Sequence, residues 1–379
     1  MKKILFITSS LISIFCLISC LSCRKVESKA ERMSLREKLG QMFVIRPESL
    51  DPSYSVTEVH QTYGYGSEFI SQEMIETYKN YPAGGVILFP KNIINPEQTK
   101  NLTSQIHALN TIPTFIYVDE EGGPVTRVSR NPEFNLPVFK DMKTIGETGD
   151  PEIAYRAGRT IGSYLKEYGF DVDFAPVADV DTNPDNPIIG RRAFSSNPNQ
   201  AAKMDSAFYK GLKAEGIFGC YKHFPGHGDT QTDTHKGYTE LNKSWKELLE
   251  CEIIPFKAGI AEKINFIMIS HITCPKVDSS GNPTTFSKVL LQDKLRKELK
   301  YEGIIITDSM EMGAILNEFD PAEAAIQSIL AGADIILIPY NYTKTFDAVE
   351  KAVKEGRISE KRINESVSRI LKVKGLEQN

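Results

Sequence analysis

Eight short runs of apolar residues restrict the fold of this chain more than any other feature of its sequence. Each run is five or six residues long and is hydrophobic almost throughout rather than alternating. Continuous runs of this kind are typical of parallel β-strands that are buried on both faces of a sheet. The runs span residues 41–45, 84–89, 114–118, 172–177, 217–221, 265–270, 303–307 and 334–339.

Polar segments with helix-start signals separate these runs. A capping side chain followed by proline at the first helical position predicts helix starts at Asn95-Pro96, Asp150-Pro151, Asn197-Pro198 and Asp320-Pro321. Ser244 begins a capping-box pattern, and residues 359–374 form a closing amphipathic pattern. Eight strands alternating with helices predict an α/β fold, a single (β/α)8 TIM barrel. The alternative is a doubly wound open sheet, but no glycine-rich phosphate loop follows the first run.

The domain organisation follows from the extent of this pattern and from the composition. The barrel would occupy residues 33–375, and we expect no second domain. With 41% hydrophobic residues, 25% charged residues and a net charge of −4, the composition is that of a soluble globular protein. It has no basic excess, so we expect no nucleic-acid partner, and we expect a monomer.

The first 23 residues form a separate signal segment. Lys2 and Lys3 precede an apolar run that is short for a membrane span and typical of a signal peptide. The sequence "LISC" resembles the lipobox of bacterial lipoproteins, which makes Cys20 the expected lipidation site; Cys23 is a poorer match. We therefore expect an exported lipoprotein, held by its lipid on the periplasmic side or at the cell surface. An ordinary signal peptide and a retained anchor are the alternatives.

Polar side chains follow the predicted strands at their carboxyl ends, where barrel enzymes carry their active sites. These are Asp119, Asp179, the pair Lys222 and His223, His271 and Asp308. Asp308 follows a wholly apolar strand, and an acid held there suits a nucleophile. Helix capping is the alternative for any single one of these carboxylates.

The segment "YKHFPGHGDTQTDTHKG" (221–237) contains three histidines. His223 and His227 have a spacing that would suit zinc on a helix, but proline and glycine between them disfavour a helix. A metal site stays an alternative. Proton transfer fits better, because Asp233 could orient His235 and favour its protonated form. We expect Lys222 and His223 to donate to substrate hydroxyls and His227 to brace the loop.

Several stretches together resemble the family 3 glycoside hydrolases, and most closely the bacterial β-N-acetylhexosaminidases of that family. They are "DEEGG", "DFAPVADV", "NPIIGRRAF", "KHFPGHGD" with a following "DTH", "IMISHI" and "GIIITDSMEMGA". They occur in order from about residue 35 to residue 375. The resemblance implies one (β/α)8 barrel and a retaining double displacement without metal or cofactor.

The resemblance also assigns roles to residues of this sequence. Asp308 would be the nucleophile, and His235, paired with Asp233, would be the general acid/base. The residues expected to bind the sugar hydroxyls are Asp119, Arg127, Arg192, Lys222 and His223, with Arg192 preferred over its neighbour Arg191. Pro124 departs from the family pattern, in which arginine often follows "EGG". The aromatic segment 51–69 is also unusually long, and it either extends the rim of the site or forms a surface loop.

The expected function is removal of terminal β-linked N-acetylglucosamine from peptidoglycan fragments or chito-oligosaccharides. Phosphorolysis of the same substrates is one alternative, since histidine repels phosphate less than a carboxylate would. A metal-dependent barrel hydrolase and a non-catalytic sugar-binding lipoprotein are the others.

Overall fold

The computed structural model describes residues 28–231 and 239–377. Its main sheet has eight parallel strands in the order β10-β1-β2-β3-β4-β5-β7-β9. Each predicted run overlaps one of these strands. They are β1 (Phe43–Ile45), β2 (Gly85–Ile87), β3 (Phe115–Val118), β4 (Val172–Asp173), β5 (Phe218–Phe224), β7 (Phe266–Ile269), β9 (Ile304–Thr307) and β10 (Ile336–Leu337).

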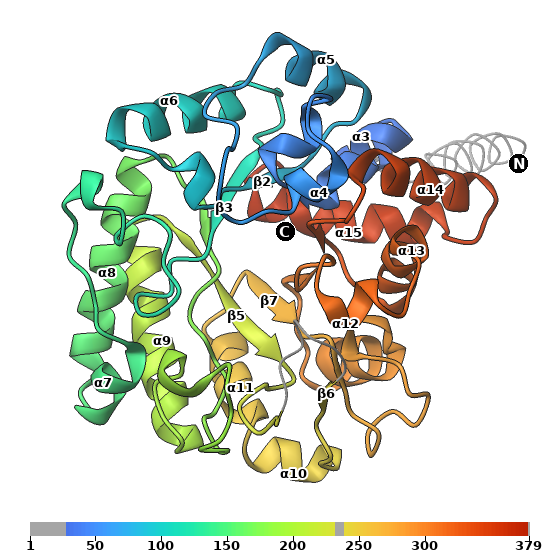
Figure 1. Cartoon of the computed structure of the whole chain (residues 1–379). Coiled ribbons are helices and arrows are strands. Elements are labelled where there is room, and N and C mark those ends of the chain that lie inside the picture. The colour runs from blue at the N-terminus through green and yellow to red at the C-terminus, as the bar shows by residue number, and fades with distance from the viewer. Residues whose placement is uncertain (1–27, 232–238, 378–379) are drawn as a thin grey trace, which may run out of the picture.

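The two edge strands of this order, β9 and β10, meet and close the sheet. Ile306 and Ile335 form a parallel bridge, and Thr307 N donates to Ile335 O at 3.0 Å. Leu337 N in turn donates to the hydroxyl of Thr307 at 3.0 Å. With helices surrounding the strands (Figure 1), this closure confirms the predicted (β/α)8 barrel.

Helices form between the strands where the sequence signals them. The α-helices are α2 (Lys29–Arg32), α3 (Leu35–Gln41), α4 (Val56–Val59), α5 (Gln72–Asn80), α6 (Pro96–His107), α7 (Met142–Glu147), α8 (Pro151–Glu167), α9 (Pro198–Ala214), α10 (Trp245–Glu250), α11 (Ile253–Ala261), α12 (Gly313–Leu316), α13 (Pro321–Ala331), α14 (Tyr342–Lys354) and α15 (Glu360–Val373). A π-helix, η6 (Val289–Glu298), precedes β9.

The predicted helix starts are confirmed by their hydrogen bonds. The side chains of the four residues before the prolines each accept a backbone N–H of the first turn. Ser244 begins α10 with a complete capping box. Ser359 caps α15, whose buried face includes Ile363, Val367 and Leu371.

Two of the strands whose ends differ from the sequence prediction, β4 and β5, lie next to the site. β4 ends at Asp173, well short of residue 177; Pro176 has no N–H to donate, and pairing with β5 resumes at a bridge between Val177 and Lys222. β5 continues beyond residue 221 to Phe224, so Lys222 and His223 lie on the strand itself. A short parallel pair, β6 (Thr239–Glu240) with β8 (Ile272–Thr273), was not predicted.

Aromatic side chains fill the interior of the barrel. Tyr117 of β3 packs against Phe174 and Phe266, with ring centroids 5.3 and 6.0 Å apart. Gly85 on the neighbouring strand leaves room for this ring, because a β-carbon there would lie 2.3 Å from Tyr117. The centre is therefore a packed core, and the site must lie at the ends of the strands.

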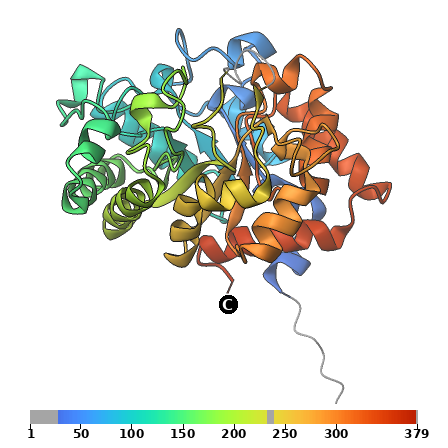
Figure 2. The same ribbon diagram turned by 90° about the horizontal axis from the view of Figure 1, so that it is seen from below.

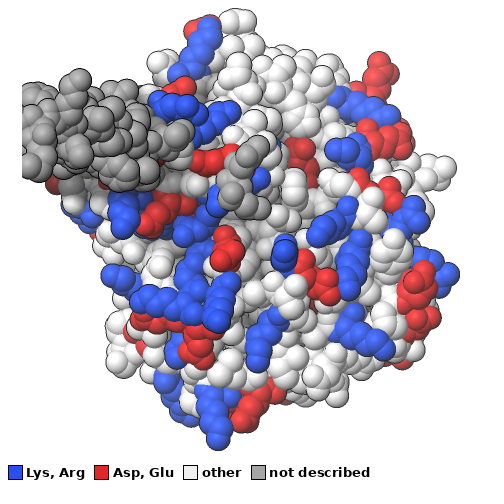
Figure 3. Space-filling model, turned by 180° about the vertical axis from the view of Figure 1, so that it is seen from behind, with Lys and Arg blue, Asp and Glu red and all other residues white. Residues whose placement is uncertain are grey.

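Helices from the two ends of the described chain pack together, with α15 against α2 and α3. Seen from below, the C-terminus and the first described helices lie on the same side of the molecule (Figure 2). On the face shown in Figure 3, basic and acidic side chains are interspersed. Within residues 28–231 and 239–377, no helix has both the length and the apolar composition needed to cross a bilayer.

Candidate active site

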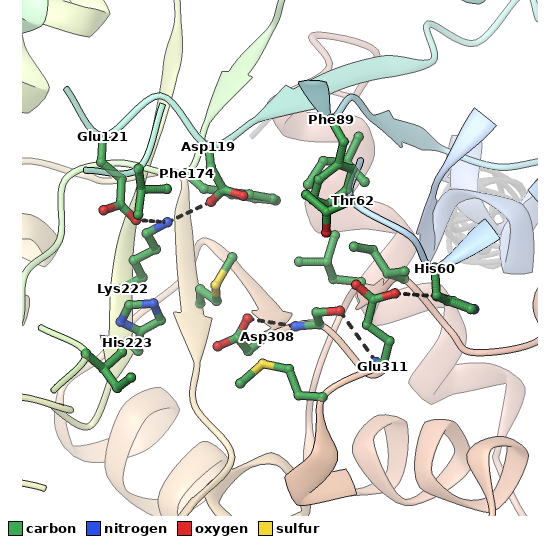
Figure 4. Close-up of a pocket in the computed structure, with 18 of the residues that line it drawn as sticks. His60, Thr62, Phe89, Asp119, Glu121, Phe174, Lys222, His223, Asp308 and Glu311 are labelled. Carbon is green, nitrogen blue, oxygen red and sulfur yellow. Dashed lines mark hydrogen bonds and ion pairs between the residues drawn. The ribbon is translucent and has the colours of Figure 1, made fainter. Parts of the chain in front are cut away.

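A cavity of about 520 Å³ opens among the loops that follow the strands. The structure describes six of the eight predicted catalytic and sugar-binding residues, and all six line this cavity: Asp119, Arg127, Arg192, Lys222, His223 and Asp308. Figure 4 shows Asp119, Lys222 and His223 on one side of Asp308, and His60, Thr62 and Glu311 on the other. The strand ends therefore bring together residues that are up to 189 positions apart in sequence (308 − 119).

Lys222 is clamped between two carboxylates. Its Nζ lies 2.8 Å from Asp119 Oδ1 and 2.6 Å from Glu121 Oε1, and its side chain is almost fully buried. Burial alone would lower the pKa of Lys222, but Asp119 and Glu121 outweigh it and raise that pKa above its usual range. Lys222 is therefore a fixed cation that can donate to a substrate oxygen.

Glu121 joins Lys222 to Arg192. The guanidinium of Arg192 donates to both Glu121 oxygens, each at 2.8 Å, which is the strong bidentate geometry. Burial would raise the pKa of Glu121, but Arg192 and Lys222 hold it well below its usual range. Arg191, by contrast, is exposed and lies 3.9 Å from Asp141.

The motif "DEEGG" places alternate side chains on opposite sides of an extended segment. Asp119 and Glu121 face the cavity, whereas the buried Glu120 points into the following turn. There its carboxylate accepts the N–H groups of Arg127, Val128 and Ser129 at 2.6–2.9 Å. Glu120 therefore positions the backbone of Arg127, whose side chain lies 3.5 Å from Asp119. Pro124 is exposed and does not line the cavity.

His223 is oriented by a buried aspartate. Its Nδ1 lies 2.7 Å from Asp179 Oδ2, and the other oxygen of Asp179 accepts the N–H of His223 at 3.2 Å and of His227 at 2.6 Å. Burial would raise the pKa of Asp179, but the two histidines lower it overall. Nδ1 of His223 is thus engaged, and Nε2 is the nitrogen turned toward Arg192, at 3.5 Å.

His227 belongs to a buried hydrogen-bonded loop, as predicted. Thr230 Oγ1 lies 2.7 Å from His227 Nδ1, and Asn186 Nδ2 donates to the carbonyl of His227 at 2.7 Å. Burial and the nearby His223 lower the pKa of His227 to about 4. The ring of His227 also lines the cavity, so this loop forms part of the cavity wall.

Asp308 follows β9 directly. Its backbone N–H donates to Ile269 O at 2.9 Å, which fixes it to β7, and its Oδ1 accepts from Ser309 N at 2.7 Å. His271, which was expected on this rim, instead lies buried beneath it. It contacts the carbonyl of Ser309 at 2.9 Å and the hydroxyl of Thr285 at 2.6 Å, and thereby supports the residue after Asp308.

A second group of residues, missed by the sequence analysis, forms the far wall of the cavity. Glu311 contacts both His60 and the fully buried Arg46. The ring of His60 stacks on Tyr340 with centroids 4.7 Å apart. His60 and Thr62 come from segment 51–69, which therefore extends the rim, one of the two interpretations above.

Three of the predicted site residues, Asp233, His235 and Cys20, lie outside the described residues. The positions that flank 232–238 are fixed: Asn186 Nδ2 donates to Thr230 O at 3.1 Å, and Thr239 pairs with Ile272 in the small sheet. In the described part of the chain, no cluster of three or more His, Cys, Asp or Glu residues is suited to hold a metal ion. Cys220, Cys251 and Cys274 are not in disulfides.

The fold and the cavity define a (β/α)8-barrel enzyme whose pocket combines carboxylates with fixed cations, a set suited to polyhydroxylated substrates. Residues 34–373 match the model of the glycosyl hydrolase family 3 N-terminal domain. The chain therefore belongs to glycosyl hydrolase family 3, and it is a glycoside hydrolase.

Individual relatives are consistent with this membership. The chain is 38% identical to a β-hexosaminidase of Nitrosomonas eutropha over 261 residues, 67% of this chain and 73% of the relative. It is 32% identical to β-hexosaminidase A of Pseudoalteromonas piscicida over 330 residues, 80% of this chain but only 55% of that relative's length.

Solved structures show the same fold. A family 3 β-N-acetylglucosaminidase from Paenibacillus sp. superposes with a TM-score of 0.82 at 32% identity, covering 91% of this chain and 62% of that one. A β-N-acetylhexosaminidase from Beutenbergia cavernae gives a TM-score of 0.79 at 25% identity, covering 90% of this chain and 99% of that one.

Proposed function

We propose that this chain is a retaining exo-β-N-acetylhexosaminidase that releases terminal β-linked N-acetylglucosamine from chito-oligosaccharides or peptidoglycan fragments. One observation carries the proposal: Asp308 faces a cavity whose opposite side is a fixed group of charged donors and acceptors (Figure 4). The relatives named β-hexosaminidase support the choice of sugar.

The sugar-binding side of the cavity offers both donors and acceptors to hydroxyl groups. Lys222 and Arg192 supply N–H groups, and His223 presents Nε2. Among the described residues, the second oxygen of Asp119 is shared with Arg127 alone, 3.5 Å away. Because these groups already neutralise one another, they need little reorganisation when a sugar binds. This side would hold the non-reducing sugar and present C1 to Asp308.

The reaction proceeds in two displacements. In the first, a carboxylate oxygen of Asp308 forms a bond to C1 while the C1–O glycosidic bond breaks and His235 gives its proton to the leaving oxygen. In the second, His235 takes a proton from water, the water oxygen bonds to C1, and the bond from C1 to Asp308 breaks. Two inversions leave the product with the β-configuration of the substrate.

The test is turnover of an aryl β-N-acetylglucosaminide by the wild-type enzyme and two variants. Asp308→Ala should lose activity at least about 10³-fold, because it removes the nucleophile. The matched control is Asp293→Ala, an exposed aspartate of η6 that should retain wild-type activity. Near wild-type turnover by Asp308→Ala would overturn the proposal. Formation of a sugar 1-phosphate when phosphate is added would identify a phosphorylase instead.

We also propose that the protein is exported and anchored through a lipid on Cys20. The support is the basic start, the apolar run and the "LISC" sequence at residues 17–20. In a bacterial host with the lipoprotein pathway, the wild-type chain should incorporate labelled fatty acid and partition with membranes, and Cys20→Ala should do neither. Equal labelling of Cys20→Ala would exclude this residue as the site.

A further inference from the structure

The rim segment between β1 and β2 exposes aromatic rings beside the active-site cavity. Five large hydrophobic side chains are exposed among the described residues, and three of them lie in this segment: Tyr63 at 72%, Tyr65 at 94% and Phe69 at 60%. Tyr63 directly follows Thr62, which lines the cavity. Clustered exposed apolar side chains next to a site commonly mark a binding surface.

The segment is anchored before the tyrosines. His60 contacts Glu311 through Nδ1 and the carbonyl of Tyr340 through Nε2 at 2.5 Å. The buried Lys91 donates from Nζ to the carbonyls of Glu58 and Val59 at 3.3 and 3.1 Å. The chain is therefore held to both β9–α12 and β10–α14 loops before it reaches Tyr63.

A second set of contacts anchors the segment after the tyrosines. Ser67 N donates to the fully buried Glu48 at 2.8 Å, and Asn92 Nδ2 donates to the same oxygen at 2.6 Å and to Ser67 O at 3.2 Å. Gly66 lies so close to Lys91 that a β-carbon would approach it to 2.7 Å. Only residues 61–65 lie between the two anchors.

This frame ties the backbone on both sides of the two exposed tyrosines to buried charged residues. Burying Lys91 and Glu48 is costly unless their partners are fixed, so the loop conformation is tied to a specific polar network. A loop whose backbone is anchored before a ligand arrives loses less conformational entropy on binding than an unanchored one. Two exposed aromatic residues on an anchored loop are better explained by stacking against a ligand than by an incidental surface loop.

The lack of lysine, arginine, aspartate and glutamate in this segment favours a neutral ligand over a charged one. No lysine, arginine, aspartate or glutamate occurs from Val59 to Ser67. A carboxylate on the leaving-group sugar, or a charged peptide stem, would find no fixed cation of this segment. The apolar C–H face and hydroxyl edge of a neutral pyranose match a tyrosine ring with its phenolic oxygen.

We propose that Tyr63 and Tyr65 form a stacking platform for the leaving-group sugars of neutral, β-linked N-acetylglucosamine oligomers. The inference rests on the proposed function, which places the non-reducing sugar at Asp119, Lys222 and His223. The rest of the chain then extends past Asp308 toward the wall that carries His60 and Thr62 (Figure 4). The platform makes longer chito-oligosaccharides better substrates than short ones.

The test compares kcat/KM for chitotetraose with kcat/KM for the 4-nitrophenyl glycoside of the same sugar. In the double variant Tyr63→Ala/Tyr65→Ala, this ratio should fall about three- to tenfold, through KM for chitotetraose, with thermal stability unchanged. The variant Tyr63→Phe/Tyr65→Phe keeps both rings and should retain most of the wild-type ratio. Val138→Ala, an exposed apolar change outside the segment, is the matched control.

An unchanged ratio in the double alanine variant, whether neither substrate is affected or both lose activity equally, would overturn the platform. Wild-type protein that cleaves neither chitotetraose nor the aryl glycoside would refute the proposed function itself, whereas normal wild-type turnover with an unchanged ratio refutes only the platform.

Discussion

At the scale of single residues, Lys222 is a buried cation that forms ion pairs with both Asp119 and Glu121. Replacing it by methionine keeps much of its volume but removes charged hydrogen bonds to two carboxylates. We expect Lys222→Met to lower kcat/KM about 100-fold, which corresponds to about 2.7 kcal/mol. Lys210→Met changes an exposed lysine of α9 and should leave kcat/KM unchanged. A folded Lys222→Met with wild-type kcat/KM would contradict this role.

The lowered pKa of His227 also leads us to expect that the stability of the protein depends on pH. Its pKa is about 4 in the folded protein and about 6.5 in the unfolded chain, so between these values only the unfolded chain is protonated. Its contribution is therefore complete above pH 6.5 and is lost as the pH falls toward 4. From pH 7 to pH 5 the loss is about 2 kcal/mol.

Urea denaturation of the wild type and of His227→Gln at these two pH values checks this prediction. Glutamine does not titrate, so the variant should lose about 2 kcal/mol less stability than the wild type between pH 7 and pH 5. Equal losses in the two proteins would show that His227 is not the group responsible.

At the scale of elements, the turn after β3 depends on a single buried carboxylate. Glu120 accepts three backbone N–H groups, and Tyr164 of α8 also donates to it, at 2.8 Å. Glu120→Gln replaces one acceptor oxygen by an NH₂ group that faces these donors. We expect a loss of about 2 kcal/mol in the free energy of unfolding. We also expect KM to rise about tenfold, because Arg127 is displaced.

The control for this turn is Glu133→Gln, an exposed change on the same connection. It should alter neither stability nor KM. An unchanged KM in Glu120→Gln would show that the turn does not position Arg127 for substrate binding.

Comparing the predicted with the observed elements shows how much of the fold and the site could be predicted from the sequence. Apolar runs and Asn-Pro or Asp-Pro pairs are local signals, so the predicted strands and helix starts lie close to the observed ones. The position of Asp119, Lys222 and Asp308 after strands followed from barrel topology. The pairing of His60 with Glu311, 251 residues apart, and of Arg192 with Glu121 depends on loop conformation, which has no local pattern. Glu121 had one available signal, its i, i+2 relation to Asp119.

At the scale of the whole molecule, Asp334 joins the elements that close the barrel. One of its oxygens accepts from Ser366 and Arg369 of α15 at 2.6 and 3.0 Å; the other accepts from Ile305 N of β9 at 2.9 Å and contacts Arg296 of η6. Burial would raise the pKa of Asp334, but the surrounding arginines lower it overall.

Asp334→Asn should therefore reduce the free energy of unfolding by about 3 kcal/mol at pH 7, because it leaves three partly buried arginines without their counter-ion. Since the folded pKa lies below the unfolded one, the wild-type advantage is present above about pH 3.9 and is lost as the pH falls through the folded value. Urea denaturation at pH 7 and pH 3 measures this change. Asp293→Asn, an exposed i, i+4 partner of Lys297, should cost under about 0.5 kcal/mol.

Covalent trapping tests the central claim, that Asp308 forms a glycosyl–enzyme intermediate, most directly. The wild-type enzyme is incubated with a 5-fluoro derivative of N-acetylglucosaminyl fluoride, in which the fluorine on C5 slows the second displacement. The protein is then digested and analysed by mass spectrometry. We predict one added sugar per chain, on the peptide that contains Asp308, and none in Asp308→Ala. A sugar attached to a different residue, or turnover of this compound without any labelled enzyme, would contradict the mechanism.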